Sequence, residues 1–217
     1  MKLHLGCSDD YREGFTNVDR LPRNAPAAVD YQPADLNAPW PWPDSSVEHI
    51  VANDVFEHIS GIGFTAWLGK DDLGNAAMRF SAGVSPKIHV LNEAHRVLVP
   101  GGLLEFSVPC VYLIDADGRP NGINPGAFAD PTHVSYWTWD DQFYFAEQFN
   151  HAGGERGRMG PDYGITAVFR FPKIVETTRG WETAIGQPDP ELLWKITRYG
   201  NGRAQRTKLI ARIKAVK

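Results

Sequence analysis

The sequence contains only two cysteines, Cys7 and Cys110, among its 217 residues. Two cysteines cannot form a disulfide framework, and these two lack the paired spacing of a zinc site, so we expect two free thiols. Uninterrupted apolar stretches are only a few residues long, and the amino-terminal residues lack the apolar region of a signal peptide. We therefore expect no membrane-spanning helix and a cytoplasmic protein.

The chain also lacks an excess of basic charge, since its formal net charge is −4. Nucleic-acid binding needs a clustered basic surface, so a nucleic acid is disfavoured as a partner. The stretch from Arg198 to Lys217 is a local exception, rich in lysine and arginine and free of acidic residues. We interpret it as a solvated terminal strand, with an anionic substrate or partner as the alternative.

The composition is that of an ordinary globular protein, with 42% hydrophobic and 22% charged residues. Its length suits a single domain over residues 1–217. Apolar runs that end at glycine, aspartate, asparagine or proline predict four strands: Leu3–Leu5, Phe15–Val18, Val47–Ala52 and Leu103–Val108.

The segment from Pro86 to Leu98 has the clearest helical pattern. Pro86 suits a first helical turn, Ser85 can cap it, and Leu91 and Ala94 fall on one apolar face. A strand, this helix and a strand form a βαβ unit, whose crossover is right-handed. The pattern predicts an α/β fold with a Rossmann-like, mostly parallel sheet and helices on both faces.

Later segments add detail to this fold. Val168–Thr177 and Lys208–Val216 are predicted to form an antiparallel strand pair at the end of the sheet. Thr138–Asp141 has the pattern of a capping box that begins a second helix. Two long segments rich in glycine and proline, Gly61–Gly83 and Tyr112–Pro131, are expected to form a lid on the acceptor side.

Polar residues at the predicted strand ends indicate a binding site. Ligands of open parallel sheets bind beyond the carboxyl ends of the strands, where the strand order reverses. Gly6 ends the first strand and allows close backbone approach, and Asp19 ends the second, where a carboxylate can accept hydrogen bonds from ribose hydroxyls. Asp35 can accept a hydrogen bond from an exocyclic amine, and Leu36 beside it offers an apolar contact. Asn53 and Asp54 form a polar pair that could bind a cationic group.

Five sequence blocks occur in an order typical of one enzyme family. They are Leu3-His4-Leu5-Gly6-Cys7, Asn17-Val18-Asp19, Pro41-Trp42-Pro43-Asp44-Ser45-Ser46, Ala52-Asn53-Asp54-Val55-Phe56-Glu57-His58-Ile59, and Glu93-Ala94-His95-Arg96-Val97-Leu98-Val99-Pro100-Gly101-Gly102-Leu103-Leu104. Together they resemble the class I S-adenosylmethionine-dependent methyltransferases, in particular the small methyltransferase-domain, type 11-like group.

The resemblance implies S-adenosylmethionine as the cofactor and assigns roles to individual positions. Gly6, with Cys7 beside it, would lie under the methionine portion, and Asp19 would bind the ribose. Asp35 and Leu36 would flank the adenine. The pair Asn53 and Asp54 would lie near the methionyl end.

Methyl transfer from a sulfonium needs mainly alignment, and a base only where the acceptor must lose a proton. Two histidines are catalytic candidates for that step. His133 follows the long Tyr112–Pro131 segment and is expected on the acceptor side, with a hydrogen bond that ties this loop to the sheet as the alternative role. His58 is the second candidate, but Glu57-His58 is interpreted first as the start of a helix.

Two other functions remain open. An NAD(P)-dependent oxidoreductase would need a Gly-x-Gly-x-x-Gly fingerprint, of which this chain has one glycine. A catalytically inactive S-adenosylmethionine-binding module is the second alternative. The segment Asn53-Asp54-Val55-Phe56 lacks the motif of amino-methylating nucleic-acid enzymes, so the expected acceptor is a small molecule or a sugar. The sequence does not determine the oligomeric state.

Overall fold

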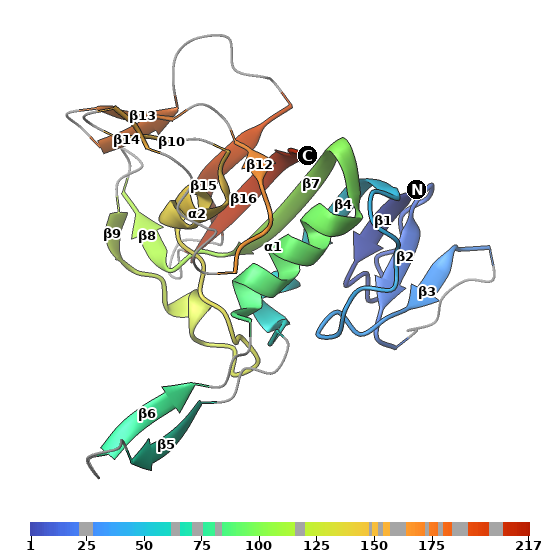
Figure 1. Ribbon diagram of the computed structural model, residues 1–217, viewed down its shortest axis with the longest axis horizontal. Coiled ribbons are helices and arrows are strands. Elements are labelled where there is room, and N and C mark those ends of the chain that lie inside the picture. The colour runs from blue at the N-terminus through green and yellow to red at the C-terminus, as the bar shows by residue number, and fades with distance from the viewer. Residues whose placement is uncertain are drawn as a thin grey trace.

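An eight-stranded mixed sheet forms the centre of the computed structural model (Figure 1). The structure describes residues 1–21, 28–61, 66–70, 76–80, 84–115, 120–147, 149–151, 154–156, 164–171, 174–177, 180–183, 191–199 and 206–217. The sheet consists of β1 (Lys2–Leu5), β2 (Thr16–Asp19), β3 (Tyr31–Pro33), β4 (Val47–Asn53), β7 (Leu98–Pro109), β12 (Phe169–Arg170), β15 (Leu193–Tyr199) and β16 (Arg206–Ala215).

The strand order is β12-β16-β7-β4-β1-β2-β3, and β15 pairs with β16. The neighbours from β3 to β7 are all parallel, whereas β16 is antiparallel to β7, β12 and β15. The first four strands lie in the order 3-2-1-4 of a Rossmann-like sheet, so the direction of winding reverses between β1 and β4. The predicted fold class is confirmed, including its antiparallel carboxyl-terminal strands.

The central strands are apolar because both of their faces are covered. On one face Leu3 and Leu5 of β1 and Ile50 and Ala52 of β4 are fully buried, and on the other face His4 and Val51 are 3% and 4% exposed. The predicted strands agree with β1, β2 and β4 to within one residue at each end, and β7 begins at Leu98 and so includes the predicted Leu103–Val108. The short strand β3 was not predicted.

Helix α1 (Pro86–Val97) crosses one face of the sheet (Figure 1). It buries the side chains of Leu91 and Ala94, as the apolar spacing predicts, and also those of Val90 and Val97. Pro86 occupies its first turn, but the Ser85 side chain makes no capping hydrogen bond, contrary to expectation. The helix ends at Val97 because the next residue turns to an extended conformation and begins β7.

Helical cover is sparse within the described residues. Besides α1, the only α-helix there is the four-residue α2 (Gln142–Phe145), preceded by the 3₁₀ turn η3 (Trp139–Asp141) with the predicted capping box. The helix expected from Glu57-His58 is a single 3₁₀ turn, η1 (Phe56–His58). The connection between β1 and β2 is a loop, consistent with a parallel crossover too short for a full helix.

Four separate hairpins complete the described structure. They are β5 (Ala66–Lys70) with β6 (Ala76–Phe80), β8 (Tyr112–Ile114) with β9 (Pro120–Ile123), β10 (Phe149–His151) with β11 (Gly154–Arg156), and β13 (Ile174–Thr177) with β14 (Gly180–Thr183). The predicted strand Val168–Thr177 is thus divided, since β12 joins the main sheet and β13 pairs with β14.

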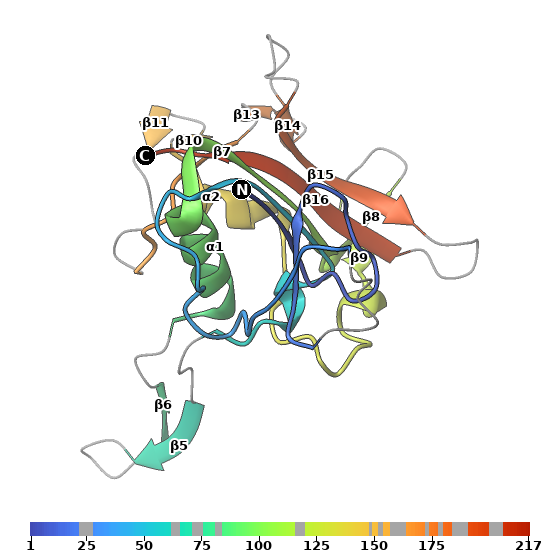
Figure 2. The same cartoon turned by 90° about the vertical axis from the view of Figure 1, so that its right-hand side faces the viewer.

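Two of these hairpins lie in the predicted insertions. The β5–β6 hairpin falls within Gly61–Gly83 and stands away from the sheet in both views (Figures 1 and 2). The β8–β9 hairpin and the 3₁₀ turn η2 (Pro125–Ala127) fall within Tyr112–Pro131. Residues 62–65, 71–75, 81–83 and 116–119 of these insertions lie outside the described residues. No helix in the described part of the chain is long and apolar enough to cross a membrane.

Candidate functional site

A cleft of about 510 Å³ lies at the carboxyl ends of the parallel strands. It is lined by residues that follow β1, β2, β3 and β4: Gly6, Asp19, Arg20, Ala34, Asp35, Leu36, Asn37, Asp54, Val55, His58 and Ile59, together with Thr132 from a later loop. The cleft therefore lies where the winding of the sheet reverses, the usual binding position in an open α/β sheet. Of the predicted cofactor residues, five line it.

The first two of these residues end adjacent strands. Gly6 has a φ of +62°, and a Cβ added there would lie 2.3 Å from Cγ2 of Val55, so only glycine fits this turn. The Asp19 carboxylate accepts hydrogen bonds from the backbone amides of Ser8 (2.9 Å) and Arg20 (2.6 Å). Each carboxylate oxygen retains a lone pair for a further donor.

Asp35 and Leu36 line the opposite part of the cleft. The backbone and side-chain amides of Asn37 donate to Oδ1 of Asp35 at 3.0 and 2.8 Å, and these hydrogen bonds lower the pKa of the Asp35 carboxyl. Leu36 is buried and supplies the apolar contact. Asn37 in turn accepts hydrogen bonds from the backbone and hydroxyl of Ser60. This network fixes an ionised acceptor beside an apolar surface.

Of the remaining predicted cofactor residues, Asp54 lines the cleft, whereas Asn53 and Cys7 do not. The carboxylate of Asp54 also pairs with Nζ of Lys208. The amide oxygen of Asn53 accepts a hydrogen bond from Oγ of Ser107. Cys7 is buried, and burial raises the pKa of its thiol to about 11. Its sulfur is therefore uncharged at neutral pH.

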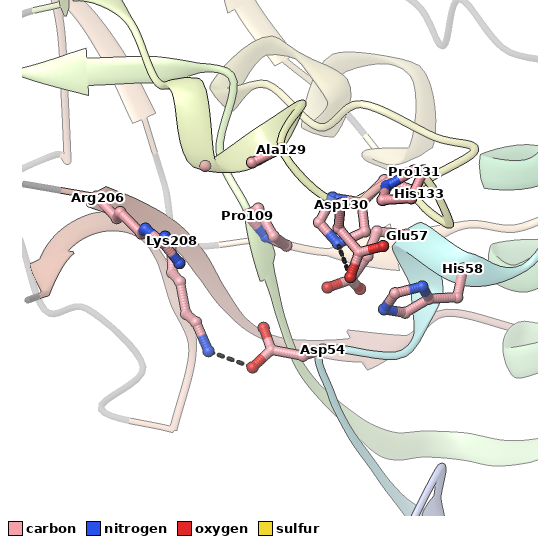
Figure 3. Close-up of a pocket in the computed structure, with 11 residues that line it drawn as sticks. Asp54, Glu57, His58, Pro109, Ala129, Asp130, Pro131, His133, Arg206 and Lys208 are labelled. Atoms are coloured by element: carbon pink, nitrogen blue, oxygen red, sulfur yellow. Dashed lines mark hydrogen bonds and ion pairs between the residues drawn. The ribbon is translucent and has the colours of Figure 1, made fainter. Parts of the chain in front are cut away.

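A second cleft of about 550 Å³ adjoins the first, since Asp54 and His58 line both (Figure 3). Its other lining residues come from η1, the end of β7, the loop after η2 and the start of β16: Glu57, Pro109, Gly126, Ala129, Asp130, Pro131, His133, Arg206 and Lys208. Both predicted catalytic histidines thus face one cleft. His133 comes from the loop that the sequence placed on the acceptor side.

Glu57 is the most unusual residue of this second cleft. It is 1% exposed, and within the described residues neither oxygen of its carboxylate has a hydrogen-bond partner. Burial raises the pKa of this carboxyl to about 8, and the negative charge of Asp54 contributes in the same direction. A buried carboxyl group without a partner is costly, so it indicates a missing partner or a function.

Glu57, His58 and His133 form a compact group. One ligand atom of each residue lies within 4.8 Å of those of the other two, and the two imidazole centroids are 4.8 Å apart. Nδ1 of His133 lies 2.9 Å from the carbonyl oxygen of Ala127, so the expected loop hydrogen bond exists, within the loop itself. Nδ1 of His58 lies 2.9 Å from Oγ1 of Thr132.

The basic carboxyl-terminal stretch forms β16, with alternate side chains buried. Three of its cations pair with carboxylates: Lys208 with Asp54, Arg212 with Glu105, and Lys214 with Glu191. Arg206 and Lys208, at the start of the strand, line the second cleft. The stretch is therefore a paired strand in most of its described length, and it also contributes positive charge to a cleft.

Sequence reasoning missed the unpartnered state of Glu57. Its position beside Asp54 and before His58 indicated only a helix start. The interaction that buries it is not local, because the backbone amides of Val134 and Ser135 donate to the Glu57 carbonyl and bring their loop over η1. The signal that was available is the glutamate-histidine pair a few residues after the end of β4.

No protein-family model and no curated protein sequence matches the chain. Among solved structures, it is similar to an S-adenosylmethionine-dependent methyltransferase from Mesorhizobium loti, with 13% identity over 98% of this chain and 90% of the other and a TM-score of 0.41. A candidate methyltransferase from Haloferax volcanii, solved with the Trm112 activator, has 13% identity over 100% of this chain and 82% of the other, with a TM-score of 0.48. An S-adenosylmethionine-dependent methyltransferase from Methanosarcina mazei is similar with 11% identity over 99% of this chain and 92% of the other and a TM-score of 0.38.

Proposed function

We propose that the chain is an S-adenosylmethionine-dependent methyltransferase that acts as one domain, residues 1–217. The observation that carries the proposal is the cleft at the reversal point of the sheet. It gathers Gly6, Asp19, Asp35, Leu36 and Asp54, which are five of the positions that the family resemblance assigns to the cofactor. Its volume of about 510 Å³ is within the usual range of about 300–1,000 Å³ for small-molecule sites.

The residues of the cleft fit S-adenosylmethionine in their chemistry. The free lone pairs of the Asp19 carboxylate accept the ribose hydroxyls, and charge-assisted hydrogen bonds of this kind are strong. Asp35 accepts a hydrogen bond from the exocyclic amine of adenine, and Leu36 contacts the ring. Gly6 leaves room for the methionine portion, and Asp54 offers negative charge to its amino or sulfonium group. The bound cofactor supplies an activated methyl group.

The second cleft is proposed to hold the acceptor. It shares Asp54 and His58 with the first cleft, so the two ligands would meet at these residues. Its lining mixes carboxylates, imidazoles and the cations of Arg206 and Lys208, which suits a polar small molecule or a sugar. His133 and His58 face this cleft, and either could take a proton from an acceptor hydroxyl.

The loop of the second insertion is proposed to be part of an acceptor-side lid. Ala129, Asp130 and Pro131 line the acceptor cleft, and Thr132 just beyond them lines the cofactor cleft. The same loop therefore contacts both ligands in this proposal. The first insertion, Gly61–Gly83, would extend the lid.

Isothermal titration of the full chain with S-adenosylmethionine, with NADH in a parallel experiment, tests the cofactor assignment. We expect one S-adenosylmethionine per chain and no heat of binding with NADH. Binding of NADH alone would favour the oxidoreductase. Binding of S-adenosylmethionine without methylation of any compound in a small-molecule and sugar panel would favour the inactive binding module.

A further inference from the structure

The carboxylate of Glu57 points to a ligand that the proposed methyl transfer does not require. Its side chain lines the second cleft, yet both of its oxygens lack a hydrogen-bond partner among the described residues. The neighbouring side chains with lone pairs are the imidazoles of His58 and His133 (Figure 3). A cation is the ligand that satisfies two imidazoles and a buried carboxylate together.

Among the described residues, Nε2 makes no hydrogen bond in either imidazole, although Nε2 of His133 lies 3.9 Å from Oδ2 of Asp130. Nδ1 of His133 can only donate to the Ala127 carbonyl, so Nε2 of the neutral ring carries a lone pair. The Thr132 hydroxyl donates to Oδ1 of Asp130 at 2.6 Å and therefore accepts from Nδ1 of His58. Nε2 of His58 carries a lone pair for the same reason. Histidines that bind metals are usually held by such a hydrogen bond at the other nitrogen.

We propose that Glu57, His58 and His133 bind one divalent transition-metal ion in the second cleft. In a tetrahedral zinc site, bonds of about 2.0–2.2 Å place two ligand atoms about 3.3–3.6 Å apart. The three ligand atoms lie within 4.8 Å of one another, so metal binding requires these distances to shorten by up to about 1.5 Å, which side-chain rotation can supply. Asp130, which lines the same cleft, adds negative charge beside the three ligands, whereas Asp54 there is paired with Lys208.

The ligand set selects the class of ion. Two imidazoles and one carboxylate suit zinc, cobalt, iron or nickel, whereas magnesium and calcium prefer oxygen ligands only. Three protein ligands leave coordination positions open toward the cleft, as in sites where a metal binds a substrate. The role of the ion rests on the proposed function: it would bind an acceptor oxygen and lower its pKa. In that case His58 and His133 are ligands and not bases.

Metal binding is measured on the full chain after treatment with a chelator. We expect one Zn²⁺ per chain by titration calorimetry, visible absorption of tetrahedral or five-coordinate Co²⁺, and no comparable binding of Mg²⁺. Glu57→Gln and His133→Gln should each weaken Zn²⁺ binding at least tenfold. Thr132→Val, which removes the hydrogen bond to His58, should weaken it about 10–100-fold.

His49→Gln is the matched control, because it removes a histidine that pairs with Glu105 on the sheet and does not line the cleft. It should leave Zn²⁺ affinity unchanged. Circular dichroism checks the fold of each variant. If Glu57→Gln does not fold, the Zn²⁺ affinity of His58→Gln, at a partly exposed position, is measured in its place and should also be weakened.

The proposal is overturned if the chain binds no Zn²⁺ or Co²⁺ at micromolar concentration, or if the ligand variants bind as tightly as the unchanged protein. Titration with S-adenosylmethionine on the same samples separates the two proposals. Cofactor binding without metal binding would support the methyltransferase function and refute the metal site. Metal binding without cofactor binding would support the metal site and refute the methyltransferase function.

Discussion

Asp19 is the residue on which the proposed cofactor site depends most. Its carboxylate is positioned by backbone amides on both sides, from Ser8 and Arg20, and faces the cleft with unused lone pairs. Hydrogen bonds to a charged group contribute about 1.5–3 kcal/mol each. The ribose is therefore expected to be bound mainly by this one side chain.

The substitution Asp19→Asn is predicted to weaken S-adenosylmethionine binding about 10–100-fold, because the amide removes the charge and one acceptor but keeps the shape. Titration calorimetry measures the change, with Asp9→Asn as the control, an exposed aspartate outside the cleft. An unaltered dissociation constant in Asp19→Asn would show that the ribose lies elsewhere.

At the scale of the elements, Arg96 links α1 by hydrogen bonds to residues 40–44, the segment that follows Asp35 and Leu36 of the first cleft. Its guanidinium donates to the carbonyl oxygens of Trp40 and Trp42 and to the carboxylates of Glu93 and Asp44. The hydrogen bonds to Glu93 raise the pKa of Arg96 above its ordinary value. One side chain thereby satisfies the backbone of a segment that has no regular structure.

We predict that Arg96→Gln lowers the free energy of unfolding by about 1–3 kcal/mol, since the carbonyls and carboxylates lose their partner. Urea denaturation measures the difference. Arg170→Gln is the matched control: its ion pair with Glu147 spans 3.7 Å and its side chain is 60% exposed, so a change within about 0.5 kcal/mol is expected. Equal effects of the two substitutions would contradict the role of Arg96.

The loop that contains Asp130 and Thr132 is predicted to exchange its amide hydrogens more slowly when S-adenosylmethionine is added, because Thr132 lines the cofactor cleft. Hydrogen exchange followed by mass spectrometry measures this for peptides over residues 120–133. Peptides over residues 174–183, which form the separate β13–β14 hairpin, are the internal control. Uniform or absent slowing would argue against a lid at this loop.

For the whole molecule, stability depends on pH in two opposing ways: His4 contributes a loss of stability as the pH is lowered, whereas the raised pKa of the buried Glu57 carboxyl contributes a gain. His4 is buried in β1, and burial lowers the pKa of its imidazole below about 6.5, although a hydrogen bond with Asn17 opposes the shift. Protonation then favours the unfolded chain. The contribution of His4 is fully present above the unfolded pKa and is lost as the pH falls from that value through the lower pKa of the folded state.

The substitution His4→Gln is accordingly predicted to shift the change in melting temperature from pH 7 to pH 5 toward a smaller loss or a larger gain, because the variant has no imidazole to protonate. Thermal unfolding at several pH values measures the slope for both proteins. A variant with the same slope as the unchanged protein would mean that His4 does not titrate differently in the folded and unfolded states.

Much of the fold was predictable because its determinants are local. Strands β1 and β4 contain short groups of buried apolar residues that end at glycine or asparagine, and α1 has a proline at its first turn and apolar residues at helical spacing. The division of Val168–Thr177 between β12 and β13 was not predictable, since each half is paired by a distant strand or hairpin. Strand pairing depends on contacts that a local pattern does not contain.

The candidate site divides in the same way. Gly6, Asp19 and Asp54 could be selected from the sequence because each lies at or near the end of a predicted strand, and parallel strands bring their carboxyl ends to one edge. Asp35 and Leu36 were selected without the strand before them, since β3 was not predicted. The roles of all five in binding stay predictions. Only the tertiary structure decided the environment of Glu57: burial and the lack of a partner arise where the loop of His133 folds over η1, and no local pattern specifies that contact.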